Sequence, residues 1–358
     1  MSTGSEFSKK VMHLNILMGS ILMKRKLLPF AIAAAVAVPG VALADATIYG
    51  KLNVSLRNVD TGEDTWELES HASRLGFKGD AELDYGLTAI YQLEYEISPD
   101  QEEAGDSKDV FKQRDIFVGL KGGFGTLKVG NMDTPLKKAQ GKVDLFSDVV
   151  DMNILLDGEN RQDNAIRYTS PKFADMFTID TMIEVGDGAE RDTNGDDTDD
   201  EVRDGISEGA SIAVTAGDSK YKKQPFYAAL AYENDMTENK GISIIRAVAG
   251  YKINDITLGA LYQTSEGELE SNKDYDDDGF LLSAAYSMDK LTFKGQFISS
   301  DQSVDTKGPI DGEGGEMFTL GVDYKLGKKT KTYVYYGDGE NDAKDELTVY
   351  GLGLEHKF

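Results

Sequence analysis

The stretch TIYGKLNVSL, residues 47–56, places apolar and polar side chains in strict alternation. A period of two residues is typical of a β-strand that has one apolar face. The same alternation returns in AIYQLEYE (89–96) and in the closing stretch YGLGLEHKF (350–358). Each stretch has one apolar or aromatic face and one polar or charged face. The sequence therefore predicts a chain made mainly of two-faced strands.

Turn signals divide the chain after residue 45 into sixteen candidate strands. No proline lies deep inside any of them, as a hydrogen-bonded ladder requires. The strands are expected at 46–59, 70–83, 86–97, 109–121, 124–132, 162–171, 176–185, 208–217, 223–234, 242–252, 255–265, 279–288, 290–300, 316–326, 330–337 and 346–358.

The connections between these strands alternate in length. Short turns are expected at 84–85, 122–123, 172–175, 218–222, 254, 289 and 327–329. Long, acidic loops are expected at 99–108, 133–161, 186–207, 266–278 and 301–315. Short turns at one end and long loops at the other are the layout of an outer-membrane β-barrel.

A soluble β-sandwich or solenoid would also alternate, because its strands bury one apolar face in a core. Three further observations favour the barrel. The chain has a predicted export signal, its strand number is even and large enough to enclose water, and it ends in an aromatic residue on the apolar face. The predicted fold is an all-β transmembrane antiparallel β-barrel of sixteen strands.

Residues 23–44 read MKRKLLPFAIAAAVAVPGVALA, with a basic start, an apolar middle and the small-x-small ending ALA. This pattern predicts a secretory signal peptide, and the apolar run is shorter than the roughly 20 residues of a membrane-spanning helix. Residues 1–22 are interpreted as an N-terminal extension, either a cloning scar or an upstream start. The barrel is then expected over residues 45–358.

Composition excludes several classes of function. The 358 residues include 63 acidic and 38 basic side chains, no cysteine and three histidines. Clustered positive charge for nucleic acid is lacking, and so are thiolates for catalysis, disulfides or zinc. The first 44 residues hold five basic residues and one acidic residue, so the remaining 314 carry a formal charge of −29.

Six stretches together carry a family resemblance that covers essentially all of 45–358. They are TIYGKLNVSL (47–56), SRLGFKGDAEL (73–83), GLTAIYQLEYE (86–96), RDIFVGLKGGFGTLKVGN (114–131), NAIRYTSPKF (164–173) and LGLEHKF (352–358). In this order and spacing the chain resembles the Gram-negative general-diffusion porins. The resemblance implies a homotrimer in the outer membrane of a Gram-negative bacterium, a third long loop folded inward as a constriction, and recognition of Phe358 during assembly.

Strand parity orients the basic residues. An arginine facing lipid near the bilayer midplane costs about 2–4 kcal/mol, so Arg74 and Arg167 are expected to face the interior. The resemblance implies a basic ladder on the channel wall. Its expected members are Arg74, Arg114 and Arg167, with Lys51 and Lys112 in support and Arg161 also inward. The alternative is a set of scattered, solvated charges on the inner face.

The candidate strand 109–121 does not fit this parity cleanly. If Arg114 faces inward, strict alternation turns Ile116 and Val118 inward as well. Asp115 and Phe117 then face outward, and a subunit interface could accommodate that aspartate. The sequence leaves this conflict open.

The loop 133–160 holds six acids and three lysines, a net charge of −3. Asp144 and Asp148 are the expected acidic members of the constriction, with Asp151 behind them. Acid on one side of a narrow channel and base on the other would create a transverse field. Ordinary solvation of an acidic loop is the alternative.

The predicted function is passive diffusion of small hydrophilic solutes and ions, with a mild preference for cations. The main alternative is a substrate-selective channel on the same barrel. An outer-membrane hydrolase would need a Ser/His or Asp/His set, which two distant histidines after residue 44 do not support. A structural or adhesive surface protein would have a plugged, non-conducting lumen.

No cofactor is expected. The run Asp274–Gly279 fits the first half of an EF-hand loop, but the position of the required glutamate holds Ala285. The run Asp192–Glu201 is equally rich in carboxylates. Loose divalent-cation binding that bridges these loops to anionic lipopolysaccharide is an open alternative to a solvated loop. Expected partners are outer-membrane lipid, lipopolysaccharide, other copies of the chain and small solutes.

Overall fold

The computed structural model describes residues 46–99, 111–186, 189–191, 201–203, 205–236, 240–269, 273–302, 314–341 and 345–358. The predicted extension and signal peptide lie outside these residues. Within the described ranges, no helix is both long and apolar enough to cross a membrane.

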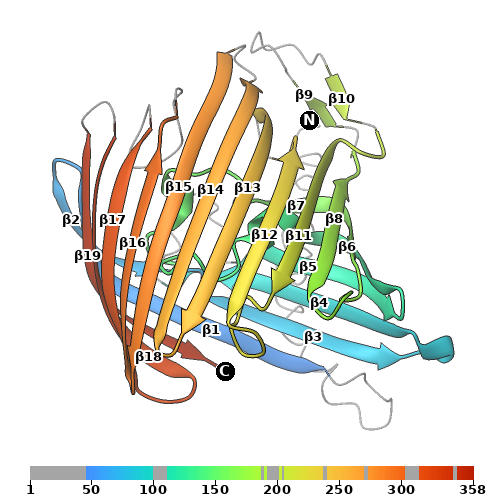
Figure 1. Ribbon diagram of the computed structural model, residues 1–358, viewed down its shortest axis with the longest axis horizontal. Coiled ribbons are helices and arrows are strands. Elements are labelled where there is room, and N and C mark those ends of the chain that lie inside the picture. Colours follow the sequence, from blue (N-terminus) through green and yellow to red (C-terminus); the bar gives the residue numbers. More distant parts are fainter. Residues whose placement is uncertain are drawn as a thin grey trace, which may run out of the picture. The chain divides into compact units, whose positions relative to one another are not determined.

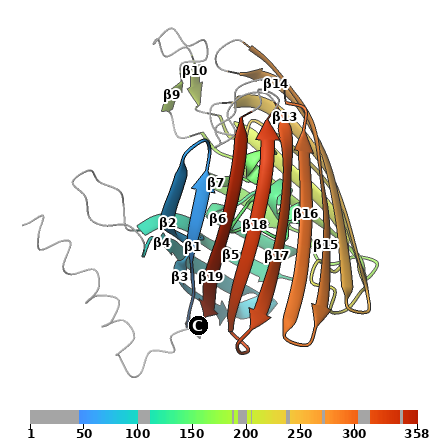
Figure 2. The same ribbon diagram turned by 90° about the vertical axis from the view of Figure 1, so that its left-hand side faces the viewer.

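Sixteen strands form one closed antiparallel ring (Figures 1 and 2). Each strand pairs with its neighbours along the chain, and the ring closes where β1 pairs with both β3 and β19. The ring consists of β1 (Thr47–Asp60), β3 (Arg74–Glu82), β4 (Thr88–Ile97), β5 (Phe111–Gly122), β6 (Gly125–Asp133), β7 (Arg161–Thr169), β8 (Phe177–Glu184), β11 (Gly209–Gly217), β12 (Phe226–Asn234), β13 (Lys240–Ile253), β14 (Ile256–Leu269), β15 (Lys273–Met288), β16 (Leu291–Ser300), β17 (Gly315–Lys325), β18 (Thr330–Asn341) and β19 (Glu346–Lys357). The predicted sixteen-stranded barrel is confirmed.

The remaining elements are short. They are the strands β2 (Asp64–Ser70), β9 (Ala189–Arg191) and β10 (Glu201–Arg203), the helix α2 (Pro135–Ala139), and the 3₁₀ turns η1 (Asp84–Gly86) and η2 (Met152–Ile154). β2 pairs with the second half of β1, residues 54–60. A bend at Ala72, whose φ is 50°, separates β2 from β3. The strand predicted at 70–83 therefore begins too early. Residue 70 is the end of β2, and β3 begins only at Arg74.

The predicted long loop 266–278 is also mostly strand. β14 and β15 stay paired as far as Leu269 with Lys273, and Glu266 lies opposite Asp276. The acidic composition of this stretch is typical of a loop, but pairing with a long neighbouring strand supplies backbone hydrogen bonds that composition does not reveal.

The two faces of the wall differ as the sequence predicts. On β1 the inward residues Lys51, Asn53 and Ser55 are at most 4% exposed, whereas Leu52 and Leu56 are 41% and 48% exposed. The exposed apolar face suits hydrocarbon, and the closed ring leaves no unpaired backbone edge within the membrane. Polar side chains therefore face the interior.

The segment between β6 and β7, drawn in green, lies inside the ring of strands (Figures 1 and 2). We refer to residues 134–160 as the inner loop. Its apolar side chains, including Leu136, Phe146 and Leu156, form one buried cluster with inward residues of β11 to β19 such as Ile244 and Met317. The main apolar core of the protein therefore lies between the inner loop and one side of the wall.

Candidate pore constriction

Hydrogen bonds tie the inner loop to successive strands along one side of the barrel. The Leu136 backbone N–H donates to Ser211 Oγ on β11 (3.1 Å), and Tyr227 OH on β12 donates to the Ala139 carbonyl (2.9 Å). Ser283 Oγ on β15 donates to the Val143 carbonyl (2.6 Å). These strands lie in one continuous part of the ring, and ion pairs such as those of Asp148 with Arg74 on β3 and of Lys138 with Asp133 on β6 connect the inner loop to the rest of the ring.

Close approach of the inner loop to the wall requires small inward residues. A Cβ added at Gly259 would lie 2.9 Å from Val143, and one added at Gly321 would lie 2.7 Å from Phe146. The wall therefore provides two glycine recesses into which Val143 and Phe146 fit.

Lys51 and Arg74 lie side by side on β1 and β3, and both face the interior as predicted. Lys51 Nζ lies 2.6 Å from Asp148 Oδ2, and Arg74 lies 3.7 Å from the other oxygen of Asp148. Arg74 also lies 3.5 Å from Glu94 on β4. The structure thus joins two predicted basic residues and one predicted acidic residue in a single contact.

A β-bulge resolves the conflict on β5. Leu93 pairs with Ile116 and Tyr95 pairs with Gln113, so Arg114 and Asp115 together lie opposite the single residue Glu94. A bulge of this kind shifts side-chain parity by one residue.

On the two sides of the bulge, different alternate residues of β5 face the interior. Both bulge residues, Arg114 and Asp115, form ion pairs inside the barrel. Phe117 packs inside against Met132, and Val118 is 61% exposed on the outer face. Arg114 faces the interior as expected, whereas the expectation that Ile116 and Val118 face inward and Asp115 and Phe117 outward is wrong.

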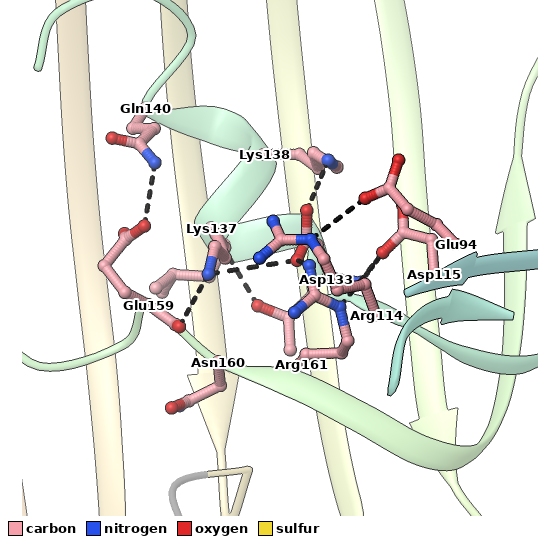
Figure 3. A network of polar contacts seen from close by, with 12 residues as sticks. Glu94, Arg114, Asp115, Asp133, Lys137, Lys138, Gln140, Glu159, Asn160 and Arg161 are labelled. Carbon is pink, nitrogen blue, oxygen red and sulfur yellow. Dashed lines mark hydrogen bonds and ion pairs between the residues drawn. The ribbon is translucent and has the colours of Figure 1, made fainter. Parts of the chain in front are cut away.

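Arg114 and Arg161 each contact two carboxylates, and Figure 3 shows Arg114 beside Glu94 and Arg161 beside Asp115 and Asp133. Arg114 lies 2.9 Å from Glu94 and 2.5 Å from Glu96. Arg161 lies 3.1 Å from Asp115 and 2.5 Å from Asp133. The carboxylates come from the neighbouring strands β4, β5 and β6.

Lysines of the inner loop extend this network at the start of α2. Lys138 lies 2.5 Å from Asp133, and Lys137 lies 3.8 Å from it. Thr134 caps α2 by accepting a hydrogen bond from the Lys137 N–H (3.2 Å), which places both lysines beside the wall.

The two remaining wall candidates lie in different surroundings. Arg167 is buried, pairs with Asp180 on β8, and donates to the Asp133 carbonyl (2.7 Å). Lys112 is exposed opposite Glu96 and has no ion pair with any residue that the structure describes. Arg167 is thus buried, as Lys51 is, whereas Lys112 is exposed.

Asp144 is buried and is not exposed to the channel as a constriction residue would be. Its oxygens accept hydrogen bonds from the Phe146 N–H (2.9 Å), the Met152 N–H (3.2 Å) and Gln296 Nε2 (3.0 Å). Burial raises its pKa to about 6. Asp144 thus accepts hydrogen bonds from two backbone amides of its own loop and from one side chain of the wall. These bonds hold the inner loop in position.

The surroundings of Asp148 and Asp151 shift the pKa values of the two carboxyl groups in opposite directions. Burial acts to raise the pKa of Asp148, but contacts with Lys51 and Arg74 outweigh it and the pKa is lowered. Asp151 caps η2 by accepting from the Asn153 N–H (2.9 Å). Burial, followed by repulsion from Asp144, raises the pKa of Asp151 to about 7.

Sequence reasoning missed the carboxylates that neutralise the wall. Glu94 and Glu96 lie on the polar side of the alternation at 89–96, so pairing of neighbouring strands would have brought them to the arginines. Arg246 on β13 was also missed. It lies 2.7 Å from Glu159 and donates to the Asp157 carbonyl (2.8 Å), and it holds the end of the inner loop.

The predicted metal-binding runs are tested only in part. Asp274–Gly279 lies within β15 and not in a loop, and most of 192–201 lies outside the described residues. In the described part of the chain, no group of three or more histidine, aspartate or glutamate side chains is arranged to hold a metal ion.

Comparison with known proteins gives a consistent result. The sequence model of the family described as Gram-negative porin matches residues 31–344. The major outer membrane protein P.IB of Neisseria meningitidis serogroup B is 27% identical, over 94% of this chain and all of that protein.

Solved structures share the fold at lower identity. The anion-selective porin from Comamonas acidovorans superposes with a TM-score of 0.69 at 21% identity, over 88% of this chain and all of that one. Salmonella typhi OmpF, in a complex with daunomycin, gives 0.67 at 17% identity, over 88% of this chain and 98% of that one.

Proposed function

Because the chain belongs to the Gram-negative porin family, we propose that it forms a water-filled channel through which small hydrophilic solutes and ions diffuse passively. Its place is the outer membrane of a Gram-negative bacterium. The observation that carries the proposal is the closed sixteen-stranded ring with apolar residues outside and charged residues inside. Barrels of this size leave an aqueous channel.

The narrow part of the channel is assigned to the level of the inner loop. Arg74, Arg114 and Arg161 form one boundary, on the wall. Asp148 and Asp151 contribute carboxylates from the inner loop, and Asp148 contacts Lys51 and Arg74 where the inner loop meets the wall. Asp144 acts through these two aspartates by holding the loop in place. Water and polar solutes orient in the field between these groups, whereas apolar solutes must displace oriented water.

A mild preference for cations is part of the proposal. Each wall arginine at this level has a carboxylate partner, with Arg74, Arg114 and Arg161 near Glu94, Glu96 or Asp115. Paired arginines attract mobile anions weakly, so the net charge of −29 and the acidic loops dominate. One unit charge about 7 Å away in a water-like medium contributes roughly 0.6 kcal/mol, a few-fold preference.

Trimer formation and contact with lipopolysaccharide complete the proposal. One of the similar solved structures is a trimer form of OmpT from Vibrio cholerae. In this chain the outward residues Val118, Leu230 and Leu352 are each 58–61% exposed, which provides apolar surface for lipid or for a neighbouring copy. Divalent cations would bridge the acidic loops to lipopolysaccharide phosphates.

Planar-bilayer recording tests the channel and the trimer together. The mature chain, 45–358, should produce conductance steps grouped in threes, with a reversal potential under a KCl gradient that favours potassium. A reconstituted, folded chain without conductance would refute the channel. A clear chloride preference would refute the selectivity and leave the channel intact.

A further inference from the structure

A cavity of about 390 Å³ lies between the inner loop and the short-turn end of the barrel. Its boundary includes the loop segment 144–149, the β11–β12 turn at Tyr221, and the inward ends of β13, β16, β18 and β19. The volume lies within the range of about 300–1,000 Å³ that is usual for small-molecule sites. We refer to it as the turn-end pocket.

The turn-end pocket has an excess of positive charge. Six lysines and four carboxylates line it, which gives a net charge of +2. The lysines are Lys142, Lys220, Lys252, Lys294, Lys331 and Lys357, and the carboxylates are Asp144, Asp148, Asp323 and Glu355. This contrasts with the level of the wall arginines, where each arginine has a carboxylate partner.

All four carboxylates of the pocket already have partners. Asp323 lies 3.1 Å from Lys294 and 2.9 Å from Lys331, and Glu355 lies 3.0 Å from Lys357. Asp148 binds Lys51, and Asp144 accepts hydrogen bonds from amides of its own loop. No carboxylate of the pocket is therefore available to the other three lysines.

Lys142, Lys220 and Lys252 have no ion pair with any residue that the structure describes. They belong to three separate elements: the inner loop, the β11–β12 turn and the end of β13. Burial, and then the nearby charges of Lys357 and Lys220, lower the pKa of Lys142. An anion beside Lys142 and Lys220 would relieve the repulsion between these two ammonium groups.

We propose that the turn-end pocket binds a small multivalent oxyanion, such as a phosphate or a di- or tricarboxylate, between Lys142, Lys220 and Lys252. The proposal rests on the proposed channel function, because the solute reaches the pocket through the lumen. Multivalent anions are favoured over chloride, since the attraction scales with the product of the charges. In outer-membrane barrels the short turns face the periplasm, so the site lies at the periplasmic end.

The test is block of potassium chloride current by citrate and by inorganic phosphate in bilayer recordings. The site variant carries Lys142→Gln, Lys220→Gln and Lys252→Gln. The control carries Lys222→Gln, Lys223→Gln and Lys328→Gln, which removes three charges from turns at the same end of the barrel but outside the pocket. Wild type and control should show concentration-dependent block by at least one anion, and the site variant should need about tenfold more of it.

Two outcomes would overturn the proposal. One is absence of block by both anions in a conducting wild-type channel, and the other is equal loss of block in the site variant and the control. Conductance in KCl alone establishes that each variant folds and that the channel function holds, independently of the pocket. If the site variant does not fold, the single change Lys142→Gln must still weaken block a few-fold.

Discussion

Arg246 of β13 and Glu159 of the inner loop form an ion pair of 2.7 Å in which the two side chains are 0% and 4% exposed. Arg246 also donates to Gln263 Oε1 (2.8 Å) and to the Asp157 carbonyl (2.8 Å). One guanidinium therefore joins the wall to the end of the inner loop.

Arg246→Met should release the inner loop, because it removes the ion-pair partner of the buried Glu159. Breaking one side of such a pair costs about 3–5 kcal/mol. We expect a lower unfolding temperature and larger fluctuations of the open-channel current. The matched control is Arg57→Met, which breaks a more exposed pair with Glu67. Equal effects of the two changes would show that Arg246 has no special anchoring role.

Asp148→Asn should reduce the preference for cations. The change removes one negative charge from the inner loop and leaves Lys51 and Arg74 without that partner. At roughly 0.6 kcal/mol per unit charge, the ratio of potassium to chloride permeability should fall a few-fold. Reversal potentials in a KCl gradient measure this ratio, and an unchanged value would remove Asp148 from the constriction.

Asp144→Asn should have a different effect from Asp148→Asn. The Phe146 and Met152 N–H groups donate to different oxygens of Asp144, and asparagine keeps only one acceptor oxygen, so its NH2 group must face one of these two N–H groups, which then loses its acceptor. Unsatisfied buried donors cost about 1–3 kcal/mol. We expect a lower unfolding temperature with little change in the permeability ratio. A loss of selectivity at unchanged stability would contradict this assignment.

Acidification from pH 8 to pH 6 should lower the preference for cations in the wild type. The pKa of Asp151 is raised to about 7, so this group is mostly ionised at pH 8 and mostly protonated at pH 6. In Asp151→Asn the permeability ratio should change less over the same interval. Identical pH profiles for wild type and variant would show that another group titrates.

Val118→Arg tests the side-chain parity beyond the β5 bulge. Val118 lies on the outer face, where an arginine near the midplane costs about 2–4 kcal/mol. Its matched control is Ile90→Arg, because Ile90 pairs with Gly119 and faces inward. Refolding into lipid vesicles under denaturant titration should show the larger loss for Val118→Arg. The reverse order would contradict the bulge.

The alternation in stretches such as 47–56 and 350–358 determined which side chains face lipid. This inference succeeds from sequence because a strand has a period of two and a charge in hydrocarbon is costly. Turn signals likewise determined the strand number, whereas the inward-folded loop was expected only from the family resemblance. Predicted inward residues such as Lys51, Arg74 and Arg167 follow from these two rules.

Tertiary structure alone decided the charge balance of the interior. Strand period does not reveal a bulge, so the parity of Asp115 and Phe117 depended on how β5 pairs with β4. Pairing of neighbouring strands also brought Glu94 to Arg114. The path of the inner loop buried Asp144 against its own backbone amides and placed Asp148 beside Lys51. These outcomes depend on contacts between residues far apart in the chain, which no local pattern records.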